Sequence, residues 1–283
     1  CPAGRQVVIA LGPSVTLGFT LCSLGFFPTE TPTSVGPFLF PPLCHYKDTM
    51  PHFPTRDLTF NGREFKLAYR SNVDQSVINE VFEYREYQAV EPIIAAAQAP
   101  IIDAGGHGGY FTLYCRALNP AVPIITIEPA AANLALMEEN FFANQVEPVE
   151  MIVGVLAART ATRQLHLARD NHNHSLVEPP IAERAGTLLV QGYALRDILD
   201  QRQIKTVSLL KLDVEGAEYE LLDGWTVDDY ARVENIIMEY HLGAVPHRTD
   251  KDLHRTLRTA GYTVTTTPSK FDARFGMIVA RKK

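Results

Sequence analysis

Short apolar runs alternate with helical patterns over most of the chain from residue 100 onward. Each run has the length of a buried strand, and the segments between the runs repeat apolar residues at spacings of three and four, which places them on one helical face. Such alternation is typical of a parallel sheet with helices on both sides. The predicted strands are residues 100–104, 122–127, 149–155, 206–212 and 233–240.

The last two apolar runs, residues 262–266 and 275–280, have no helical pattern between them. Two consecutive strands without a crossover pair antiparallel, because a parallel pair needs a long connection. We therefore predict a Rossmann-like α/β fold, in which a doubly wound, mostly parallel sheet carries an antiparallel C-terminal strand.

Residues 58–67 alternate apolar and polar side chains around Asn61-Gly62. An Asn-Gly pair between two such runs is the strongest short signal for a two-residue β-hairpin. A helical pattern follows Ser71. Pro92 should break or kink its continuation, because proline lacks the backbone N–H that a helix interior needs.

These patterns divide the chain into an N-terminal extension (1–54), a hairpin with lead-in helices (55–99) and the main domain (100–283). Within the main domain, residues 160–190 are polar and rich in His and Asn, and we interpret them as an insertion with short extended pieces. A His-x-His pair lies in this insertion. No further ligands for a metal are evident, so no metal site is predicted.

Residues 6–29 carry no charged side chain and have the length of a signal or membrane segment. Gly12, Pro13, Gly18 and Gly25 interrupt this run. Three interpretations stay open: a targeting or anchoring segment, a poorly structured extension, and translated upstream sequence. Membrane contact is the less favoured. The four cysteines show no paired spacing, so a cytoplasmic location is the default expectation.

Charge narrows the class of partner. The formal net charge is −6, and no block of Lys or Arg occurs anywhere in the chain. A nucleic acid substrate normally calls for a basic groove on the protein. Nucleic acid is therefore disfavoured as a partner.

Residues 103–109 read Asp-Ala-Gly-Gly-His-Gly-Gly and stand between the first predicted strand and a helix. Ligands of an open parallel sheet lie beyond the carboxyl ends of its strands, where glycines let the backbone approach them closely. Gly105, Gly106 and Gly108 do not fit the dinucleotide pattern, because its third glycine would fall on a phenylalanine. A pyrophosphate would be repelled by Asp103, whereas a zwitterionic amino acid with a sulfonium would not.

The second predicted strand ends at Glu128, which Pro129 follows. An acidic side chain at this place can accept hydrogen bonds from both hydroxyls of a ribose. Together with Asp103 and the glycine turn, Glu128 fits S-adenosylmethionine better than NAD.

Carboxylates concentrate at the ends of the fourth and fifth predicted strands. Asp213 ends the fourth strand, and Glu215 and Glu218 open the helix that follows. Clustered carboxylates are unfavourable unless something polar or cationic faces them. The positive end of the helix is a sufficient explanation for Glu218. The fifth strand brings Glu239 and His241 to the same edge, on the same side of the strand.

Several of these stretches resemble the FkbM family of methyltransferases. They are residues 102–112 around the glycine turn, Ile127-Glu-Pro129 with Asn140 and Asn144 after it, the Leu-Lys-Leu-Asp-Val-Glu-Gly-Ala-Glu string at 210–218, and Met238-Glu-Tyr-His241. The resemblance runs from about residue 65 to the end of the chain. His107 departs from it, because the family turn usually reads Gly-Ala-Asn.

The resemblance implies a class I methyltransferase fold with S-adenosylmethionine as cofactor. It also implies O-methylation of a glycan, a glycolipid or a polyketide-type natural product. On this basis the expected cofactor-binding residues are Asp103, Gly105, Gly106, Gly108, Tyr110, Glu128, Pro129 and Asp213.

Methyl transfer to an alcohol depends on in-line alignment and gains from removal of the hydroxyl proton. We hypothesise that His241 or Asp213 takes this proton, while Glu215 and Glu239 orient the acceptor. His241 has the more suitable unperturbed pKa. Two alternatives are a nicotinamide-dependent oxidoreductase and a cofactor-binding domain without catalysis. The sequence names neither the acceptor nor the oligomeric state.

Overall fold

The computed structural model describes residues 53–146, 149–168, 175–177, 184–270 and 272–283, together with two short strands near the N-terminus. The chain divides into two compact units, Cys1–Cys44 and His45–Lys283. In the first unit, β1 (Val7–Val8) and β2 (Gly18–Phe19) pair antiparallel. Most of the expected extension at 1–54 lies outside the described residues. Within the described part of the chain, no helix is long and apolar enough to span a membrane.

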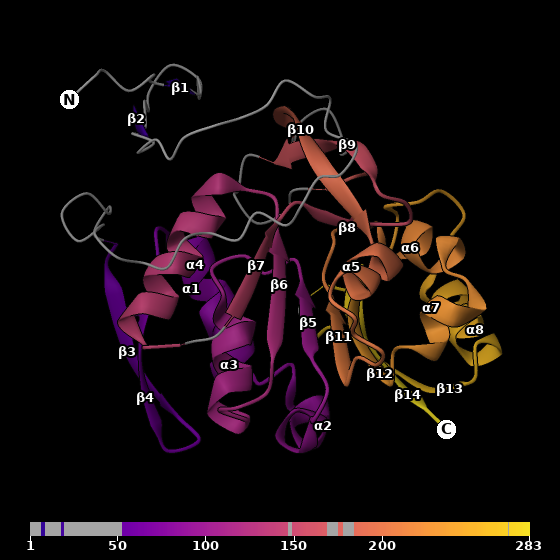
Figure 1. The fold of residues 1–283 in the computed structure, drawn as a ribbon, viewed down its shortest axis with the longest axis horizontal. Helices are drawn as coiled ribbons and strands as arrows, with labels where there is room; N and C mark the ends of the chain where they lie inside the picture. The colour runs from indigo at the N-terminus through magenta and orange to yellow at the C-terminus, as the bar shows by residue number, and fades with distance from the viewer. Residues whose placement is uncertain are drawn as a thin grey trace. The chain divides into compact units, whose positions relative to one another are not determined.

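A seven-stranded sheet forms the centre of the second unit (Figure 1). Its strand order is β13-β14-β12-β11-β5-β6-β7. All neighbours pair parallel except β14, which is antiparallel to both β12 and β13. The predicted fold class is confirmed. The strands are β5 (Ile101–Ala104), β6 (Ile124–Glu128), β7 (Val149–Val153), β11 (Leu209–Leu212), β12 (Asn235–His241), β13 (Tyr262–Pro268) and β14 (Phe275–Lys282).

Helices cover both faces of this sheet. Alternate residues of its strands point to opposite faces, so each strand contributes side chains to both packed layers. Ile101 and Leu209 pack on one side with α3 and α4, whereas Ile102 and Leu210 pack on the other with α5, α6, α7 and α8. Strands buried on both faces are continuous apolar runs, which explains the pattern seen in the sequence. The helices are α3 (Tyr110–Leu118), α4 (Ala131–Ala143), α5 (Leu195–Gln201), α6 (Glu218–Gly224), α7 (Val227–Ala231) and α8 (Asp250–Thr259).

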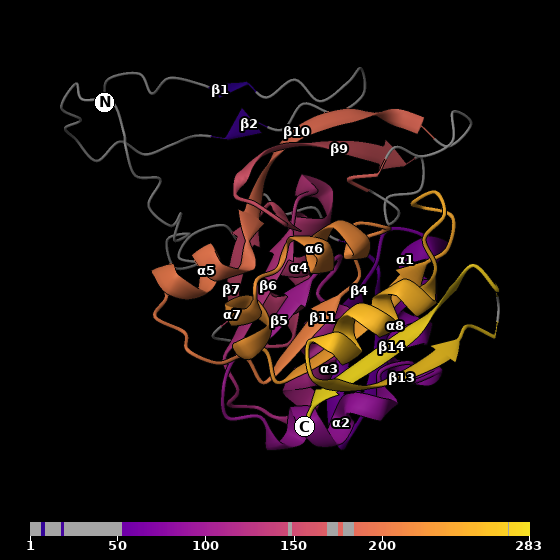
Figure 2. The same cartoon turned by 90° about the vertical axis from the view of Figure 1, so that its right-hand side faces the viewer.

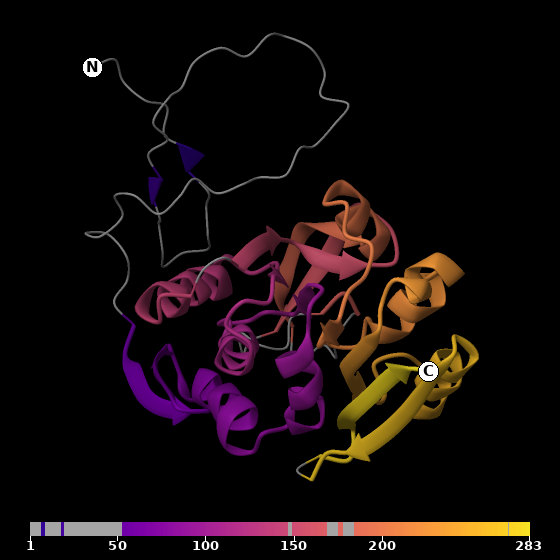
Figure 3. The same cartoon turned by 60° about the horizontal axis from the view of Figure 1, so that its bottom comes forward.

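The predicted hairpin is confirmed as β3 (Thr55–Phe60) and β4 (Arg63–Ala68). Asn61 and Gly62 have φ angles of 49° and 73°, as a two-residue turn with both residues left-handed requires. A side chain of α4 and the C-cap residue of that helix hold the hairpin: Asn140 Oδ1 accepts from Ala68 N at 2.7 Å, and Asn144 Oδ1 accepts from Lys66 N at 2.8 Å. Figure 3 shows the indigo hairpin and the yellow strands β13 and β14 at opposite ends of this unit.

The lead-in segment after the hairpin is a series of short helical pieces. α1 (Asn72–Ile78) continues as a π-helical turn, η1 (Asn79–Glu83), and a 3₁₀ turn, η2 (Gln88–Val90), leads into α2 (Glu91–Ala96). The prediction for Pro92 was wrong in its direction. Pro92 lies in the first turn of α2, where its missing N–H costs no helical hydrogen bond, so it begins a helix rather than ending one.

The polar insertion forms more regular structure than expected. β8 (Val155–Ala157), β9 (Ala161–Ala168) and β10 (Arg184–Ala194) make a second sheet in the order β8-β10-β9 (Figure 2). β9 and β10 pair antiparallel along their length, so the extended pieces are not short. The His-x-His pair lies outside the described residues.

Candidate active site

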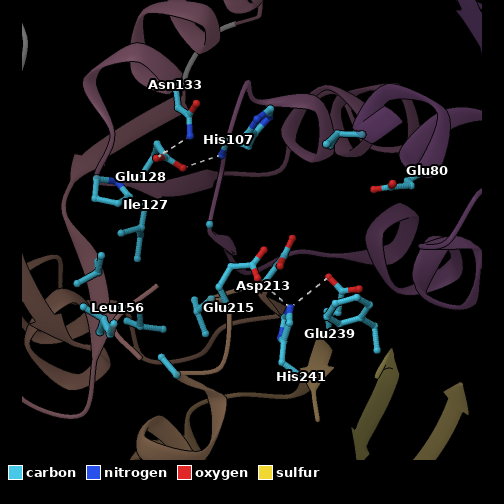
Figure 4. A pocket seen from close by; sticks show the side chains of 18 of the residues that line it. Glu80, His107, Ile127, Glu128, Asn133, Leu156, Asp213, Glu215, Glu239 and His241 are labelled. Atoms are coloured by element: carbon cyan, nitrogen blue, oxygen red, sulfur yellow. Dashed lines mark hydrogen bonds and ion pairs between the residues drawn. The ribbon is translucent and has the colours of Figure 1, made fainter. Parts of the chain in front are cut away.

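A cavity of about 340 Å³ opens at the carboxyl ends of the central strands (Figure 4). The glycine turn after β5 and the end of β6 form one side of it, and the ends of β11 and β12 form the other. The predicted site residues on its wall are Gly105, Glu128, Pro129, Asp213, Glu215, Glu239 and His241. The structure thus brings both predicted halves of the site into one cavity.

Gly105 holds the glycine turn against the end of β11. Its φ angle is 82°, and a Cβ atom there would lie 1.9 Å from the backbone oxygen of Asp213. No side chain fits between these two stretches of backbone. The close approach of the turn to β11 therefore requires glycine.

Four predicted cofactor residues lie behind the cavity wall instead of on it. A Cβ on Gly106 would meet Thr126 and Met137, and one on Gly108 would meet Leu136 and Tyr110, so these glycines serve the packing of turn and helix. Tyr110 is buried and donates from its hydroxyl to Ala68 O at 2.7 Å. Asp103, the fourth, is fully buried. None of the four lines the cavity in this structure, and each supports its wall from behind.

Lys211 is the cation that faces the buried carboxyl group of Asp103. Burial outweighs this attraction and raises the pKa of Asp103. Lys211 Nζ lies 3.2 Å from Asp103 Oδ1 and 3.5 Å from Asp213 Oδ2, and it donates to Gly105 O at 2.9 Å. Burial alone would lower the pKa of the Lys211 ammonium, but the two carboxylates outweigh it and raise this pKa. Lys211 is thus a permanent cation that ties the glycine turn to the end of β11.

Glu128 ends β6 and braces the glycine turn from the other side. Its Oε2 accepts from His107 N at 2.8 Å, and its Oε1 accepts from Ala130 N at 2.9 Å and Asn133 Nδ2 at 3.1 Å. A carboxylate offers about four acceptor directions. One direction on Oε2 therefore stays open for a hydroxyl group in the cavity.

His107, the residue that departs from the family turn, is held by the lead-in segment. Its Nε2 lies 3.2 Å from Asp74 Oδ1, and Arg70 binds the same carboxylate through Nε and Nη2 at 3.0 and 2.8 Å. Burial raises the pKa of Asp74, but the hydrogen bonds from His107 and Arg70 outweigh burial and hold this pKa well below its usual value. Among the described residues, His107 Nδ1 and Arg70 Nη1 are buried without a hydrogen-bond partner.

On the opposite side of the cavity, Asp213, Glu215, Glu239 and His241 point toward one another (Figure 4). His241 is the centre of this group. Its Nδ1 lies 3.0 Å from Glu218 Oε1, and its Nε2 lies 3.2 Å from Glu215 Oε2 and 3.9 Å from Glu239 Oε2. Glu218 was not expected here, and it gives His241 carboxylates on both ring nitrogens.

The backbone aims Glu215 into the cavity. Glu215 has a φ angle of 51° and Gly216 one of 96°, so two consecutive left-handed residues make a sharp bend between β11 and α6. Ser175 donates from its hydroxyl to the carbonyl oxygen of Glu215 and braces this bend. A left-handed glutamate costs backbone free energy, and residues strained in this way cluster at functional sites.

The pKa values of these groups differ from the sequence expectation. Burial lowers the pKa of His241, but Glu218 and Glu215 outweigh it and raise the pKa well above 6.5. Burial and repulsion by Asp213 raise the pKa of Glu239 to about 9. The argument for His241 from an unperturbed pKa is therefore wrong: at neutral pH the ring is an imidazolium.

The lead-in segment supplies cavity residues that the sequence analysis did not name. Glu80, Glu86 and Tyr87 line the wall, and burial raises the pKa of Glu86 to about 7. No Lys or Arg occurs among the described residues that line the cavity. The wall is therefore strongly acidic.

Three of the groups at the ends of β11 and β12 are spaced closely enough to hold a cation. One ligand atom each from Asp213, Glu239 and His241 lies within 4.8 Å of the others. His241 already binds a carboxylate through each ring nitrogen, and Asp213 already binds Lys211. We assign the three residues to ion pairs within the protein.

Residues 103–264, more than half of the chain, match the methyltransferase FkbM domain. The chain belongs to the FkbM methyltransferase family. It is 29% identical over 164 residues to Methyltransferase 1 of Beauveria bassiana (strain ARSEF 2860). This alignment covers 49% of the chain and 63% of the relative. It is 23% identical over 171 residues to the 31-O-demethyl-FK506 methyltransferase FkbM of Streptomyces tacrolimicus, covering 50% of this chain and 65% of the relative.

The chain thus spans less than two thirds of the length of each of these two relatives. Among solved structures, the SAM-dependent methyltransferase from Agrobacterium tumefaciens aligns at 11% identity with a TM-score of 0.48. The alignment covers 81% of this chain and 70% of that one.

As a member of the FkbM methyltransferase family, the chain has S-adenosylmethionine as its cofactor. The cavity fits this cofactor, which carries a sulfonium and an ammonium group against one carboxylate. The acidic wall matches its net positive charge, and the open direction on Glu128 Oε2 suits a ribose hydroxyl. Ile127 and Leu156 supply apolar wall between Glu128 and the acceptor side (Figure 4). Near the glycine turn, Arg70 Nη1 is a buried donor without a hydrogen-bond partner among the described residues.

Proposed function

We propose that this FkbM methyltransferase transfers the methyl group of S-adenosylmethionine to a hydroxyl oxygen of a small molecule or glycan. The observation that carries the proposal is the position of His241. It lines the same cavity as Gly105 and Glu128, on the opposite side, and each of its ring nitrogens is held by a carboxylate. A histidine held in this way can take up and pass on a proton, which an alcohol must lose when it is methylated.

The charge of the cavity wall supports an acceptor without phosphate or carboxylate groups. Glu80, Glu86, Asp213, Glu215 and Glu239 all line it, and Asp213, whose pKa is lowered, supplies a negative charge even where the raised pKa of Glu239 keeps that group protonated. An anionic acceptor would be repelled, whereas a sugar or polyol hydroxyl can donate hydrogen bonds to carboxylates. The FkbM relative from Streptomyces carries O-demethyl in the name of its substrate, which also supports an oxygen acceptor.

The cofactor supplies an electrophilic methyl group on a positively charged sulfur, and the protein residues supply alignment and proton removal. Glu215 and Glu239 orient the acceptor hydroxyl. Neutral His241 takes at Nε2 the proton that the acceptor hydroxyl loses, so that the oxygen can bind the methyl group that the sulfonium would supply, with the electrons of the broken sulfur–carbon bond staying on sulfur. Asp213 is the weaker base, because burial raises its pKa but Lys211 and His241 outweigh burial and lower it.

The resting imidazolium must first lose a proton before it can act as base. Glu215 Oε2 is 3.2 Å from Nε2, and its side chain is 20% exposed, which gives this proton a path to solvent. We expect the rate of methyl transfer to rise as the pH increases above neutral, through the raised pKa of His241.

The proposal is tested with S-adenosylmethionine that carries a deuterated methyl group and a panel of sugar and polyketide-type alcohols, some with an added amino group. We expect mass spectrometry and NMR to place the label on an oxygen. A label on nitrogen or carbon contradicts O-methylation. Calorimetric binding of S-adenosylmethionine without any labelled product from the panel would favour the non-catalytic alternative. The match to the FkbM methyltransferase domain favours a methyltransferase over the nicotinamide-dependent oxidoreductase.

His241→Ala should lower the turnover number by about 10²- to 10⁴-fold, because proton removal is lost, and should leave the dissociation constant of S-adenosylmethionine unchanged. His254→Ala is the matched control, since His254 belongs to α8 and does not line the cavity. Full turnover in His241→Ala would remove His241 from the mechanism.

A further inference from the structure

Glu218 is a buried carboxylate that the proposed function does not yet use. It is the first residue of α6 and is fully buried. Its Oε1 accepts from Gly216 N at 3.1 Å and binds His241 Nδ1 at 3.0 Å. Its Oε2 has no hydrogen-bond partner among the described residues. An ionised carboxylate at this depth needs a cation, and His241 is the group that meets it.

The contact determines which ring nitrogen of His241 faces the cavity. An ionised carboxylate only accepts hydrogen bonds, so Nδ1 must carry a proton to bind Glu218. Nε2 then points to Glu215 at 3.2 Å and toward Glu239 at 3.9 Å. The edge-to-face packing of the His241 and Phe275 rings, with centroids 5.3 Å apart, limits rotation of the imidazole.

We propose that Glu218 is a positioning residue, which fixes the His241 ring with Nδ1 protonated and Nε2 directed at the acceptor hydroxyl. This inference rests on the proposed function of His241 as the base. Glu218 itself touches neither cofactor nor acceptor, because it is buried beneath His241. Its position at the start of α6 is therefore more than a favourable charge at a helix end.

The negative charge of Glu218 has a second effect. It raises the pH at which Nε2 of His241 loses its proton. The charged groups around the ring are Glu218 on α6, Glu215 and Asp213 in the bend after β11, and Glu239 on the same strand. Asp272, before β14, lines the same cavity. Of these, Glu218 is the one without solvent exposure, so its charge is the least screened. Its negative charge stabilises the imidazolium.

The Glu218→Gln variant removes the negative charge of Glu218 but keeps the hydrogen-bond acceptor that positions the His241 ring. The amide oxygen of glutamine can still accept from Nδ1, but the negative charge is gone. NMR titration of His241 in the full chain should show a midpoint lower by about one pH unit or more than in the unsubstituted protein. Glu220→Gln is the matched control on the same helix: Glu220 is exposed, pairs with Arg163, and should leave the titration unchanged.

The pH dependence of turnover should also change in Glu218→Gln. In Glu218→Gln the rise of turnover with pH should begin at a lower pH, while the KM for S-adenosylmethionine stays the same. A residue that serves only folding would lower turnover at every pH without moving the profile. An unchanged His241 midpoint in Glu218→Gln overturns the proposal.

A measurement on the unsubstituted protein keeps the proposal testable if Glu218→Gln does not fold. The ¹⁵N shifts of His241 above its titration midpoint should show Nδ1 protonated and Nε2 free. The opposite tautomer overturns the proposal. The two failures are distinguishable: O-methylated product with the wrong tautomer removes only the role of Glu218, whereas N- or C-methylated product with the expected tautomer removes the proposed function.

Discussion

At the scale of single residues, the site depends on ion pairs between buried side chains, and only some of these ion pairs could be predicted from the sequence. Lys211 stands among leucines in a buried strand, and its partners Asp103 and Asp213 come from different elements. A charged residue inside an apolar run is itself a signal, because a buried charge needs a partner. Glu218 carried no such signal: its place at a helix start explained it, and its pairing with His241, 23 positions away, is a product of the fold.

Gly105→Ala tests the closest backbone contact of the site. The new Cβ would meet the carbonyl oxygen of Asp213 at 1.9 Å, at a φ angle that L-residues rarely adopt. We expect the free energy of unfolding to fall by about 3 kcal/mol or more, measured by urea denaturation. Calorimetry should show loss of S-adenosylmethionine binding.

Gly62→Ala is the control for backbone conformation alone. Gly62 has a similar φ angle of 73°, but nothing lies within 4 Å of the site of its Cβ. Its cost should be about 1 kcal/mol. Equal losses in the two variants would show that the contact with Asp213 does not matter.

At the scale of elements, the central strands and their helices were predictable because each is buried along a regular pattern. The hairpin was predictable because Asn61-Gly62 suits only a few turns. The second sheet was not, since β10 includes residues with exposed side chains such as Leu188 and Leu189 and shows no clear alternation. The acidic residues that the lead-in segment contributes to the cavity wall were not predicted either. They reach the cavity only through the tertiary packing of this segment, which no local sequence pattern indicates.

Asp74→Asn tests whether the lead-in segment supports the cofactor side. The substitution removes the charge that holds Arg70 and His107, whose side chains are only 15% and 12% exposed. We expect a loss of about 2–3 kcal/mol in the free energy of unfolding and weaker S-adenosylmethionine binding by calorimetry. The difference from the unsubstituted protein should shrink as the pH falls below about 4, the ordinary range of an Asp carboxyl, because a lowered pKa stabilises only above that range.

Asp57→Asn is the control, because Asp57 is an exposed residue of the neighbouring hairpin. It should change neither stability nor binding. A stable Asp74→Asn protein with unchanged cofactor affinity would contradict the supporting role of the lead-in segment.

At the scale of the whole molecule, the cavity concentrates negative charge that folding must tolerate. The folded protein holds protons on His241 and Glu239 at pH values where the unfolded chain has released them. Stability falls with rising pH wherever the folded state binds more protons. The His241 contribution is fully present below its unfolded pKa and is lost as the pH rises through its raised folded pKa. Glu239 acts in the same direction from about pH 4.5 to about pH 9.

Glu239→Gln should flatten this dependence. Glutamine resembles the protonated glutamic acid in shape and cannot ionise, so the fall in stability between pH 5.5 and 8.5 should become smaller in denaturation experiments without cofactor (the pH values are rough limits set by the two pKa values). The Glu239 side chain is 30% exposed, which weakens the effect through solvent screening. Glu234→Gln, exposed just before the same strand, is the control. An unchanged slope in Glu239→Gln would contradict the raised pKa.

The place of β14 in the sheet has a consequence for the order in which the enzyme matures. β14 follows every other strand in sequence, yet it inserts between β12 and β13, and its Phe275 and Met277 complete the cavity around His241. Domains generally fold as units, and both sides of the cavity belong to this one sheet. The wall around His241 therefore stays incomplete until translation has passed β14, and the cavity is completed only together with the sheet.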